Sequence, residues 1–493
     1  MKRIFEILPG LTSWFIIVVF LVLVIFKPLV AAVFLIIYLL FWVCRLLYMS
    51  SLLILANYRV LSQRNTNWLE MCKEATSDLD FSEILHVVLY TTYKEQSSVL
   101  EASLAALKEI DYPKDRLLVV LAGEQREAGS SDKLARIKEK FKQCFKEILI
   151  TIHPKDIEGE LAGKGANATY AAKQIRLILE KQGFDLGNVI ISVFDADTCV
   201  DKNYFACLTY QFLSNPKRYQ MSFQPLPIYN NNIFRAPAFA RVIEIGSTFW
   251  QLIEGMRPEK FITFSSHSMS FKTLVEADYW PVDLVSDDSL IFWKCFLKFD
   301  GDYTTYPLEV PVYMDIAVGK NLIDTLAVQY KQKRRWAWGV ENFVFLGLRF
   351  LKNEKIPRII KLRKLYQIFD NHVNWATWAI IISFITPLVL FWGKVVMKNA
   401  LVLFNLSYIN SIVFQSLGAI FTISFIISWQ YLPARPKDVS RFIYVSFVIQ
   451  WLLMPLISAV LGSFPALDAQ TRLMLGKYLG FFPTPKKRDN IAV

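Results

Sequence analysis

Long apolar stretches at both ends of the chain enclose a mixed, charged segment. The first runs almost without interruption from about Leu11 to Ala56, and Lys27–Pro28 interrupts it. Because a helix needs about 20 apolar residues to cross a bilayer, this stretch predicts two spans at about 11–26 and 29–55, joined by a tight turn. The run continues past the first span without a cleavage-site pattern. We therefore predict an N-terminal membrane hairpin over residues 1–56, not a removable signal peptide.

Short apolar runs alternate with helical patterns in the following segment, residues 57–345. The runs predict buried strands at 84–90, 117–121, 148–152 and 189–194. Helical spacing predicts helices at 96–110, 131–148 and 163–182. This alternation predicts a mostly parallel sheet covered on both faces, which binds ligands at the carboxyl ends of its strands.

The C-terminal part contains three more apolar runs. They lie at about 374–393, 409–430 and 442–462, within a region of C-terminal transmembrane helices predicted over residues 374–464. Interfacial helices are predicted before it, over residues 346–373. The tail, residues 465–493, mixes apolar and basic residues and predicts an amphipathic segment at the cytosolic interface.

Composition supports a membrane protein. The 493 residues are 54% hydrophobic, more than is usual for a soluble domain, and carry 55 basic against 43 acidic side chains. Basic residues cluster beside the apolar runs, so positive flanks of membrane helices explain the excess, and we expect no nucleic-acid partner. The six cysteines form no C-x-x-C pair, which argues against a zinc site or a disulfide framework.

Candidate chemistry begins with Asp195-Ala196-Asp197, directly after the predicted strand 189–194. In an extended backbone both carboxylates would face one hard divalent cation, Mg²⁺ or Mn²⁺. A solvated acidic loop is the alternative. Gly163–Asn167 opens a predicted helix, where glycines and the helix N-terminus favour an anion and Lys164 suits a phosphate. Taken without its neighbours, this segment is better explained as a loop and helix start with a solvated lysine.

Asp287-Asp288 precedes an apolar helical stretch. One of the two suits an N-cap or first-turn charge, worth about 1 kcal/mol. The functional interpretation is a general base, since adjacent carboxylates raise each other's proton affinity. His267, one of four histidines, lacks ligand spacing and is interpreted as a local hydrogen-bonding residue.

Gln332, Arg335 and Trp336 would share one helix face at positions i, i+3 and i+4. An amide, a guanidinium and an indole together suit a diphosphate and a sugar ring. The alternative is a basic and aromatic stretch at the membrane interface, which explains Lys331, Lys333 and Trp338 but not the full set so easily.

In this order the motifs resemble those of the family 2 glycosyltransferases, in particular the membrane-embedded branch of cellulose, chitin and hyaluronan synthases. The resemblance implies a GT-A-like (Rossmann-like) α/β domain inserted between transmembrane helices. Asp195 and Asp197 match the family's D-x-D, which holds a divalent ion on the donor diphosphate. Ser286-Asp287-Asp288 is similar to its T-E-D, so the role of catalytic base passes to Asp288. Gln332–Trp336 fits Q-x-x-R-W, typical of the polymerising branch.

Other positions resemble the nucleotide-binding part of the family. Tyr93-Lys94-Glu95 looks like the motif that receives the base, and Lys164 and Asn167 resemble its glycine-lysine-asparagine segment. Two positions depart from the pattern. The usual aspartate pair after the second strand is missing, which leaves Glu124 as the nearby candidate. Thr91 replaces the usual proline, so a UDP-sugar donor is only the family default.

The resemblance implies an inverting transferase in which Asp288 deprotonates the acceptor, Gln332, Arg335 and Lys164 meet the donor diphosphate, and Trp336 binds the acceptor sugar. Polysaccharide synthesis is the leading hypothesis. Transfer of a single sugar to a lipid acceptor is the second, and a non-catalytic scaffold or transporter the third. The partners are then a nucleotide sugar, a glycan or lipid-linked acceptor and the bilayer.

We expect an integral protein of a bacterial-type plasma membrane with a cytosolic catalytic domain. Two N-terminal spans place Lys2 and Arg3 inside, as the positive-inside tendency requires. Three C-terminal spans would place Lys486–Arg488 outside, against that tendency. Either Pro455 makes the last segment re-entrant, or 394–408 holds a further span.

Overall fold

The computed structural model describes residues 1–396, 401–480 and 482, which fall into two compact units. The first, here called the helical unit, contains Met1–Asn57, Phe234–Phe249 and Thr325–Leu479. The second, the sheet unit, contains Tyr58–Ile233 and Trp250–Asp324. Each is described separately.

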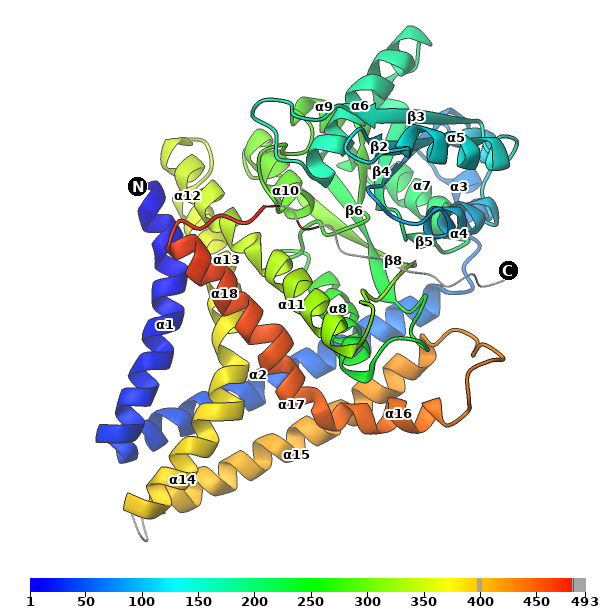
Figure 1. Ribbon diagram of the computed structural model, residues 1–493. Helices are drawn as coiled ribbons and strands as arrows, with labels where there is room; N and C mark the ends of the chain where they lie inside the picture. Colours follow the sequence, from blue (N-terminus) through cyan, green and yellow to red (C-terminus); the bar gives the residue numbers. More distant parts are fainter. Residues whose placement is uncertain (397–400, 481, 483–493) are drawn as a thin grey trace. The chain divides into compact units, whose positions relative to one another are not determined.

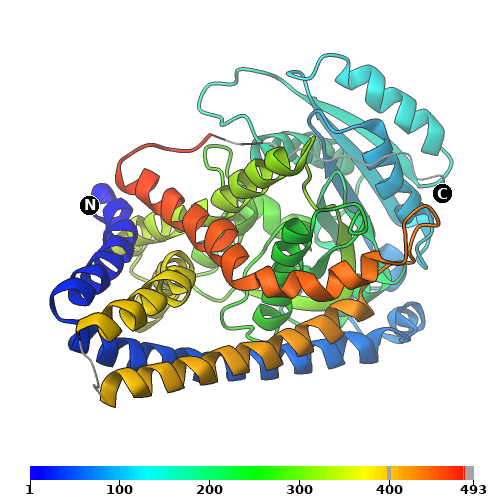
Figure 2. The same ribbon diagram turned by 60° about the horizontal axis from the view of Figure 1, so that its bottom comes forward.

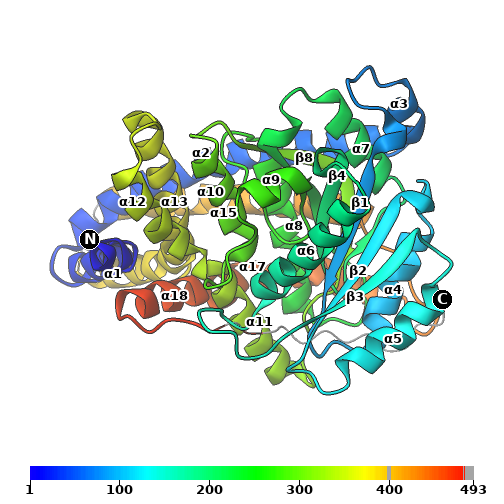
Figure 3. The same ribbon diagram turned by 90° about the horizontal axis from the view of Figure 1, so that it is seen from above.

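The sheet unit is built on a mixed sheet, seen in Figure 3. Among the described residues this sheet has eight strands in the order β3-β2-β1-β4-β7-β6-β8-β5. The strands are β1 Leu85–Thr91, β2 Leu117–Glu124, β3 Glu147–His153, β4 Val189–Asp195, β5 Cys199–Val200, β6 Met221–Tyr229, β7 Ser268–Ser270 and β8 Thr304–Met314. Pairing is parallel from β3 through β4, and β7 then runs antiparallel to both β4 and β6.

The strands predicted from apolar runs are confirmed as β1 to β4. Every residue of β1 and β2 is buried, as expected for interior strands covered on both faces, whereas the edge strand β3 is only partly buried. The predicted parallel arrangement is confirmed for β3, β2, β1 and β4. The other part of the sheet is mixed, because β7 enters antiparallel and β5 pairs antiparallel with β8.

Helices pack against this sheet and bury its apolar side chains. They are α3 Trp68–Glu74, α4 Ser97–Lys108, α5 Ser130–Phe141, α6 Lys164–Lys181, α7 Tyr204–Ser214, α9 Phe271–Glu276 and α10 Asp287–Lys298. The helices predicted at 96–110, 131–148 and 163–182 are confirmed as α4, α5 and α6, although α5 ends earlier than predicted.

The helical unit contains the long apolar helices. The helices that lie wholly or mostly in it are α1 Lys2–Phe26, α2 Pro28–Gln63, α8 Ala238–Gly255, α11 Leu322–Ala337, α12 Glu341–Lys352, α13 Arg358–Ile380, α14 Thr386–Val396, α15 Leu401–Gln430, α16 Ile443–Ile449, α17 Met454–Ile457 and α18 Phe464–Met474. Several of these continue into one another through π-helical or 3₁₀ turns. Among the described residues, four helical stretches are long and apolar enough to cross a membrane: Lys2–Phe26, Pro28–Gln63, Arg358–Gly393 and Ile443–Met474.

These stretches include the predicted spans 11–26, 29–55 and 374–393, and they cover the predicted span 442–462 from Ile443 onward. The predicted span 409–430 lies within α15, where Leu401–Val413 is a shorter apolar stretch. The predicted tail boundary near residue 465 falls inside the helical stretch Ile443–Met474, and the basic residues 486–488 lie outside the described part of the chain.

Contacts within the helical unit join distant parts of the sequence. Figure 1 shows α1 beside α18, where Ser13 Oγ donates to Gln470 Oε1 at 2.7 Å. Figure 2 shows α15 (orange) along α2 (blue), and Asn57 Nδ2 donates to Gln430 Oε1 at 2.9 Å. The N-terminal and C-terminal helices therefore form one packed assembly.

Candidate active site

A buried lysine joins two carboxylates at the carboxyl edge of the sheet. Asp195 is the last residue of β4, and Lys164 is the first residue of α6. The Lys164 Nζ lies 2.8 Å from Asp195 Oδ1 and 2.8 Å from Asp288 Oδ1. The structure therefore brings together three residues that the sequence predicted for one site.

The position of Lys164 works against local helix electrostatics. A helix N-terminus carries partial positive charge and disfavours a cation, and the Lys164 side chain is only 8% exposed. Burial lowers its pKa, but the carboxylates of Asp195 and Asp288 outweigh burial and raise the pKa above its ordinary value. Lys164 is therefore a permanent cation held by its two partners, not the solvated lysine of the alternative interpretation.

The two carboxylates of the D-x-D have different surroundings. The backbone turns after Asp195, so Asp197 does not continue the strand and the extended-backbone argument for two parallel carboxylates does not apply. Asp195 is partly exposed, and its Oδ2 accepts a hydrogen bond from Ser265 Oγ at 2.7 Å. Asp197 is fully buried, and its Oδ2 accepts from the Asp315 N–H at 2.9 Å. Asp195 is therefore the more accessible of the pair.

Exposure also separates the two aspartates of the second acidic motif. Both lie in the first turn of α10, where the helix dipole stabilises a carboxylate. Asp287 is buried at 4% exposure, whereas the Asp288 side chain is 22% exposed. Of the two, Asp288 is the one that a substrate can reach.

His267 lies beside Asp288 but is held by other partners. Its Nδ1 is 3.9 Å from Asp288 Oδ1 and 2.9 Å from the Phe264 carbonyl oxygen. The Trp280 indole N–H donates to Nε2 at 3.2 Å, so the proton of a neutral ring lies on Nδ1. Burial lowers the pKa of His267 to about 4. The ring is therefore a neutral neighbour of Asp288 at pH 7.

A second group of predicted residues lies where β1 and β2 end. The Arg126 guanidinium lies 4.5 Å from the centre of the Tyr93 ring, and its Nε donates to Glu124 Oε2 at 2.7 Å. Burial raises the pKa of Glu124, although Arg126 opposes that shift. Arg126 was not predicted. The sequence feature that could have identified Arg126 is its position two residues after Glu124, just past the end of a buried strand.

Two other predicted residues stabilise this strand end directly. Glu95 Oε2 accepts from the Tyr93 N–H at 2.5 Å and from Thr92 Oγ1 at 2.9 Å. Asn167 is buried and donates through Nδ2 to the Ala122 carbonyl oxygen at 2.9 Å. Among the described residues, its Oδ1 is buried without a hydrogen-bond partner. Glu95 therefore stabilises the turn that holds Tyr93, and Asn167 stabilises the end of β2, where Glu124 lies.

Gly165 permits the close packing of α6 against α10. A Cβ at this position would lie 2.4 Å from the Pro281 carbonyl oxygen and 2.9 Å from Asp287 Cβ. The sequence suggested that this glycine lets a ligand approach the backbone. In the structure it instead lets Pro281 and Asp287 of the same chain approach.

The third motif belongs to the helical unit. Gln332, Arg335 and Trp336 lie on α11, which confirms the predicted helix. Gln332 is 6% exposed, and its Oε1 is buried without a hydrogen-bond partner within the described part of the chain. Lys333 and Trp338 are 2% and 1% exposed. A stretch of interfacial side chains would be exposed to lipid and water, so this alternative fits the exposed Lys331 but not Lys333 and Trp338.

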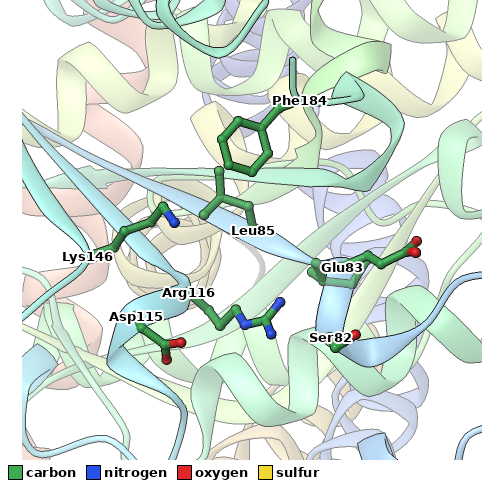
Figure 4. A pocket seen from close by; sticks show the side chains of 8 residues that line it. Ser82, Glu83, Leu85, Asp115, Arg116, Lys146 and Phe184 are labelled. Atoms are coloured by element: carbon green, nitrogen blue, oxygen red, sulfur yellow. The ribbon is translucent and has the colours of Figure 1, made fainter. Parts of the chain in front are cut away.

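A separate cavity of about 290 Å³ opens at the opposite, amino-terminal edge of the sheet, shown in Figure 4. Its lining includes Leu85, Arg116, Lys146 and Phe184. None of the predicted site residues lines it. The carboxylate cluster and this cavity are therefore distinct features of the sheet unit.

These observations define an α/β domain with a charged cluster at its strand ends, in a chain with helices apolar enough to span a membrane. The sequence model of the family "Glycosyl transferase family group 2" matches residues 190–462, more than half of the chain. The chain belongs to this glycosyltransferase family, and its α/β domain has the GT-A-like fold class that was predicted.

Two solved structures illustrate the likeness. The mannosyltransferase PcManGT from Pyrobaculum calidifontis, in complex with GDP-Man and Mn²⁺, is 12% identical with a TM-score of 0.40, covering 83% of this chain and 99% of that one. TarS 1-349 from S. aureus, in complex with UDP-GlcNAc, is 12% identical with a TM-score of 0.34, covering 80% and 93%. No curated protein matches the sequence.

Proposed function

We propose that this chain is an inverting glycosyltransferase that moves a sugar from a nucleotide-diphosphate sugar to a glycan acceptor at the membrane, in the synthesis of a polysaccharide. The observation that carries the proposal is the Lys164 ammonium shared by Asp195 and Asp288 at the carboxyl edge of the sheet. Ligands of open α/β sheets bind at this edge. Membership of the glycosyltransferase family supports the same reaction class.

Asp195 has the chemistry of a ligand for Mg²⁺ or Mn²⁺. Such hard cations need only one or two protein carboxylates when substrate phosphates provide the other oxygens. Within the described residues, no group of three or more histidine, cysteine, aspartate or glutamate side chains could hold a metal, which fits a site completed by the donor. Asp195, with Asp197 behind it, would hold the ion. The positive charge of the ion would offset the negative charge of the departing diphosphate.

Asp288 is the proposed base. Its Oδ1 is occupied by Lys164, so Oδ2 takes the proton of the attacking acceptor hydroxyl. The acceptor oxygen forms a bond to the anomeric carbon while the bond from that carbon to the diphosphate oxygen breaks, and the nucleoside diphosphate leaves with the electron pair. A single displacement inverts the configuration, so an α-linked donor gives a β-linked product.

The remaining predicted residues receive roles in the same reaction. Tyr93, Glu95, Glu124 and Asn167 line the end of the sheet proposed for the nucleotide, with a UDP-sugar as the family default. In the helical unit, Gln332 and Arg335 suit the diphosphate and Trp336 suits the acceptor sugar. Lys164 would add positive charge on the donor side.

The cellular setting follows from the donor. Nucleotide sugars are cytosolic, so we propose that the sheet unit faces the cytosol and that the apolar helices lie in the plasma membrane.

Asp288→Asn tests the proposal, with Asp287→Asn as the matched control. The first variant keeps an oxygen for Lys164 but removes the base, so transfer of labelled sugar should fall by about 10²- to 10⁴-fold. Donor affinity and unfolding temperature should stay near those of the wild type. The control removes an adjacent charge that is buried, and should keep transfer within a few-fold. Retained transfer in Asp288→Asn would refute the assignment of the base.

The length of the product tests the polymerising part of the proposal. Mass spectrometry of the product made from labelled donor should show a ladder of added sugars. A product extended by one sugar, on a lipid acceptor, would replace polysaccharide synthesis with single-sugar transfer.

A further inference from the structure

A buried lysine lies beside the proposed acceptor-binding tryptophan. Lys333, three residues before Trp336 on α11, has a side chain that is 2% exposed. Its Nζ donates to Glu244 Oε2 at 2.8 Å and to Ser247 Oγ at 3.0 Å, both on α8. The same nitrogen lies 3.6 Å from the centre of the Trp336 ring. The three N–H groups of the ammonium thus have a carboxylate, a hydroxyl and an aromatic face as partners.

Stability alone explains this arrangement poorly. The Glu244 side chain is 0% exposed, and its Oε1 has no hydrogen-bond partner among the described residues. A buried ion pair costs desolvation that apolar side chains of similar size avoid. Burial lowers the pKa of Lys333 to about 8, and Glu244 opposes this shift, so the lysine still carries its charge at pH 7. A cation kept at this cost suggests a purpose beyond packing.

Trp336 is the group that the cation can serve. Its side chain is only partly buried, whereas Ala337 and Trp338 next to it are fully buried. An indole has two rotatable side-chain bonds, so packing on part of its surface leaves other orientations available. An ammonium over one ring face favours the orientation that keeps this contact.

We propose that Lys333 is a positioning residue: with Glu244 and Ser247 of α8, it holds the Trp336 ring in the orientation that receives the acceptor sugar. This inference rests on the proposed function, in which Trp336 binds the acceptor. It assigns a role to a position within Gln332–Trp336 that the motif itself leaves open.

The neighbouring residue provides a matched control. Arg334 Nη1 donates to Asp468 Oδ2 on α18 at 2.9 Å, so it also anchors α11 within the helical unit. Because this ion pair is formed with another helix and is not the one that holds the Trp336 ring, Arg334→Met removes a comparable anchor and leaves the Lys333 contact in place.

The test uses the full chain in nanodiscs and the double variant Lys333→Met with Glu244→Met. Replacing both partners avoids an uncompensated buried carboxylate, so the unfolding temperature should stay within a few degrees of the wild type. Hydrolysis of the donor without acceptor should be unchanged, and the acceptor KM should rise by about 3- to 30-fold. Arg334→Met should leave the acceptor KM near the wild-type value.

A second measurement does not depend on catalysis. In protein labelled with 5-fluorotryptophan, Trp336→Phe identifies the ¹⁹F resonance of Trp336. In the double variant this resonance should shift or broaden, while the other tryptophan resonances stay in place. An unchanged Trp336 resonance in the double variant overturns the inference. An acceptor KM that stays at the wild-type value in this variant overturns it as well. If the wild type transfers no sugar, the proposed function fails, and the resonance still decides whether Lys333 holds the ring.

Discussion

Replacing Lys164 by methionine should destabilise the sheet unit, and a divalent cation should restore part of the loss. The oxygens Asp195 Oδ1 and Asp288 Oδ1 lie at most 5.6 Å apart, twice their 2.8 Å distance from Lys164 Nζ. Without the ammonium, two negative charges at this distance repel each other by about 3 kcal/mol at an effective dielectric constant of about 20. Measured losses on breaking buried pairs, about 3–5 kcal/mol, are of the same size.

The assay is thermal unfolding of the full chain in nanodiscs, followed by circular dichroism. A loss of about 3 kcal/mol should lower the unfolding temperature by roughly 6–12 °C for a unit of this size. Lys181→Met is the matched control, because Lys181 ends the same helix and is exposed. That control should unfold close to the wild type.

Cation addition tests the second half of the reasoning. Mg²⁺ or Mn²⁺ should raise the unfolding temperature of Lys164→Met more than that of the wild type, because the variant leaves both carboxylates without their cation. Potassium chloride at equal ionic strength controls for screening. A variant that unfolds within about 1 °C of the wild type would refute the electrostatic argument. A variant that is destabilised but indifferent to divalent ions would refute the cation-binding part alone.

Gly165→Ala should destabilise the sheet unit although alanine favours helices, because the new Cβ would lie 2.4 Å from the Pro281 carbonyl oxygen; Gly246→Ala meets no atom within 4 Å and should be neutral or stabilising by up to about 1 kcal/mol. Urea unfolding compares the two, and equal effects would contradict the packing argument. Burial lowers the pKa of His86 from 6.5 to about 3, so the unfolded chain binds the proton first and stability is lost as pH falls from about 6.5 toward 3, by about 5 kcal/mol at most. His86→Gln, which retains a polar partner for Thr209, should lose this part of the acid dependence in pH-dependent unfolding; an unchanged acid slope would contradict it.

The parallel part of the sheet was predictable because its strands are short apolar runs buried on both faces. β6 was not predicted, although all of it is buried. Pro225 and Pro227 lie inside it and argue against a central strand. The structure accommodates them because pairing with β7 is confined to Ser222 and Phe223, and the register with β8 shifts at Pro225. Whether a strand tolerates proline therefore depends on how far its neighbouring strand extends beside it. The sequence of the strand alone does not show this.

Individual site residues were predictable where a strand end or a helix face placed them, as with Asp195 on β4. Their surroundings were not. From the sequence, Lys164 could be a solvated side chain and Lys333 a side chain at the membrane interface. Both are buried in the structure. The partner of Lys164 on α10 lies 124 residues away in sequence, and that of Lys333 on α8 lies 89 residues away.

A lysine side chain prefers to be exposed, so a buried lysine needs charged or polar partners from elsewhere in the fold. The local sequence pattern shows only the preference for exposure. At Lys164 the preference is violated twice, by burial and by the helix dipole. At Lys333 it is violated by burial beside a carboxylate that is itself incompletely hydrogen-bonded. Both lysines lie within or next to the motifs that carry the proposed chemistry. Violations of local rules are most expected where function, not stability, selects the residue. The joint replacement of Lys333 and Glu244, which should leave the unfolding temperature near that of the wild type, is therefore the change that should separate activity from folding most clearly.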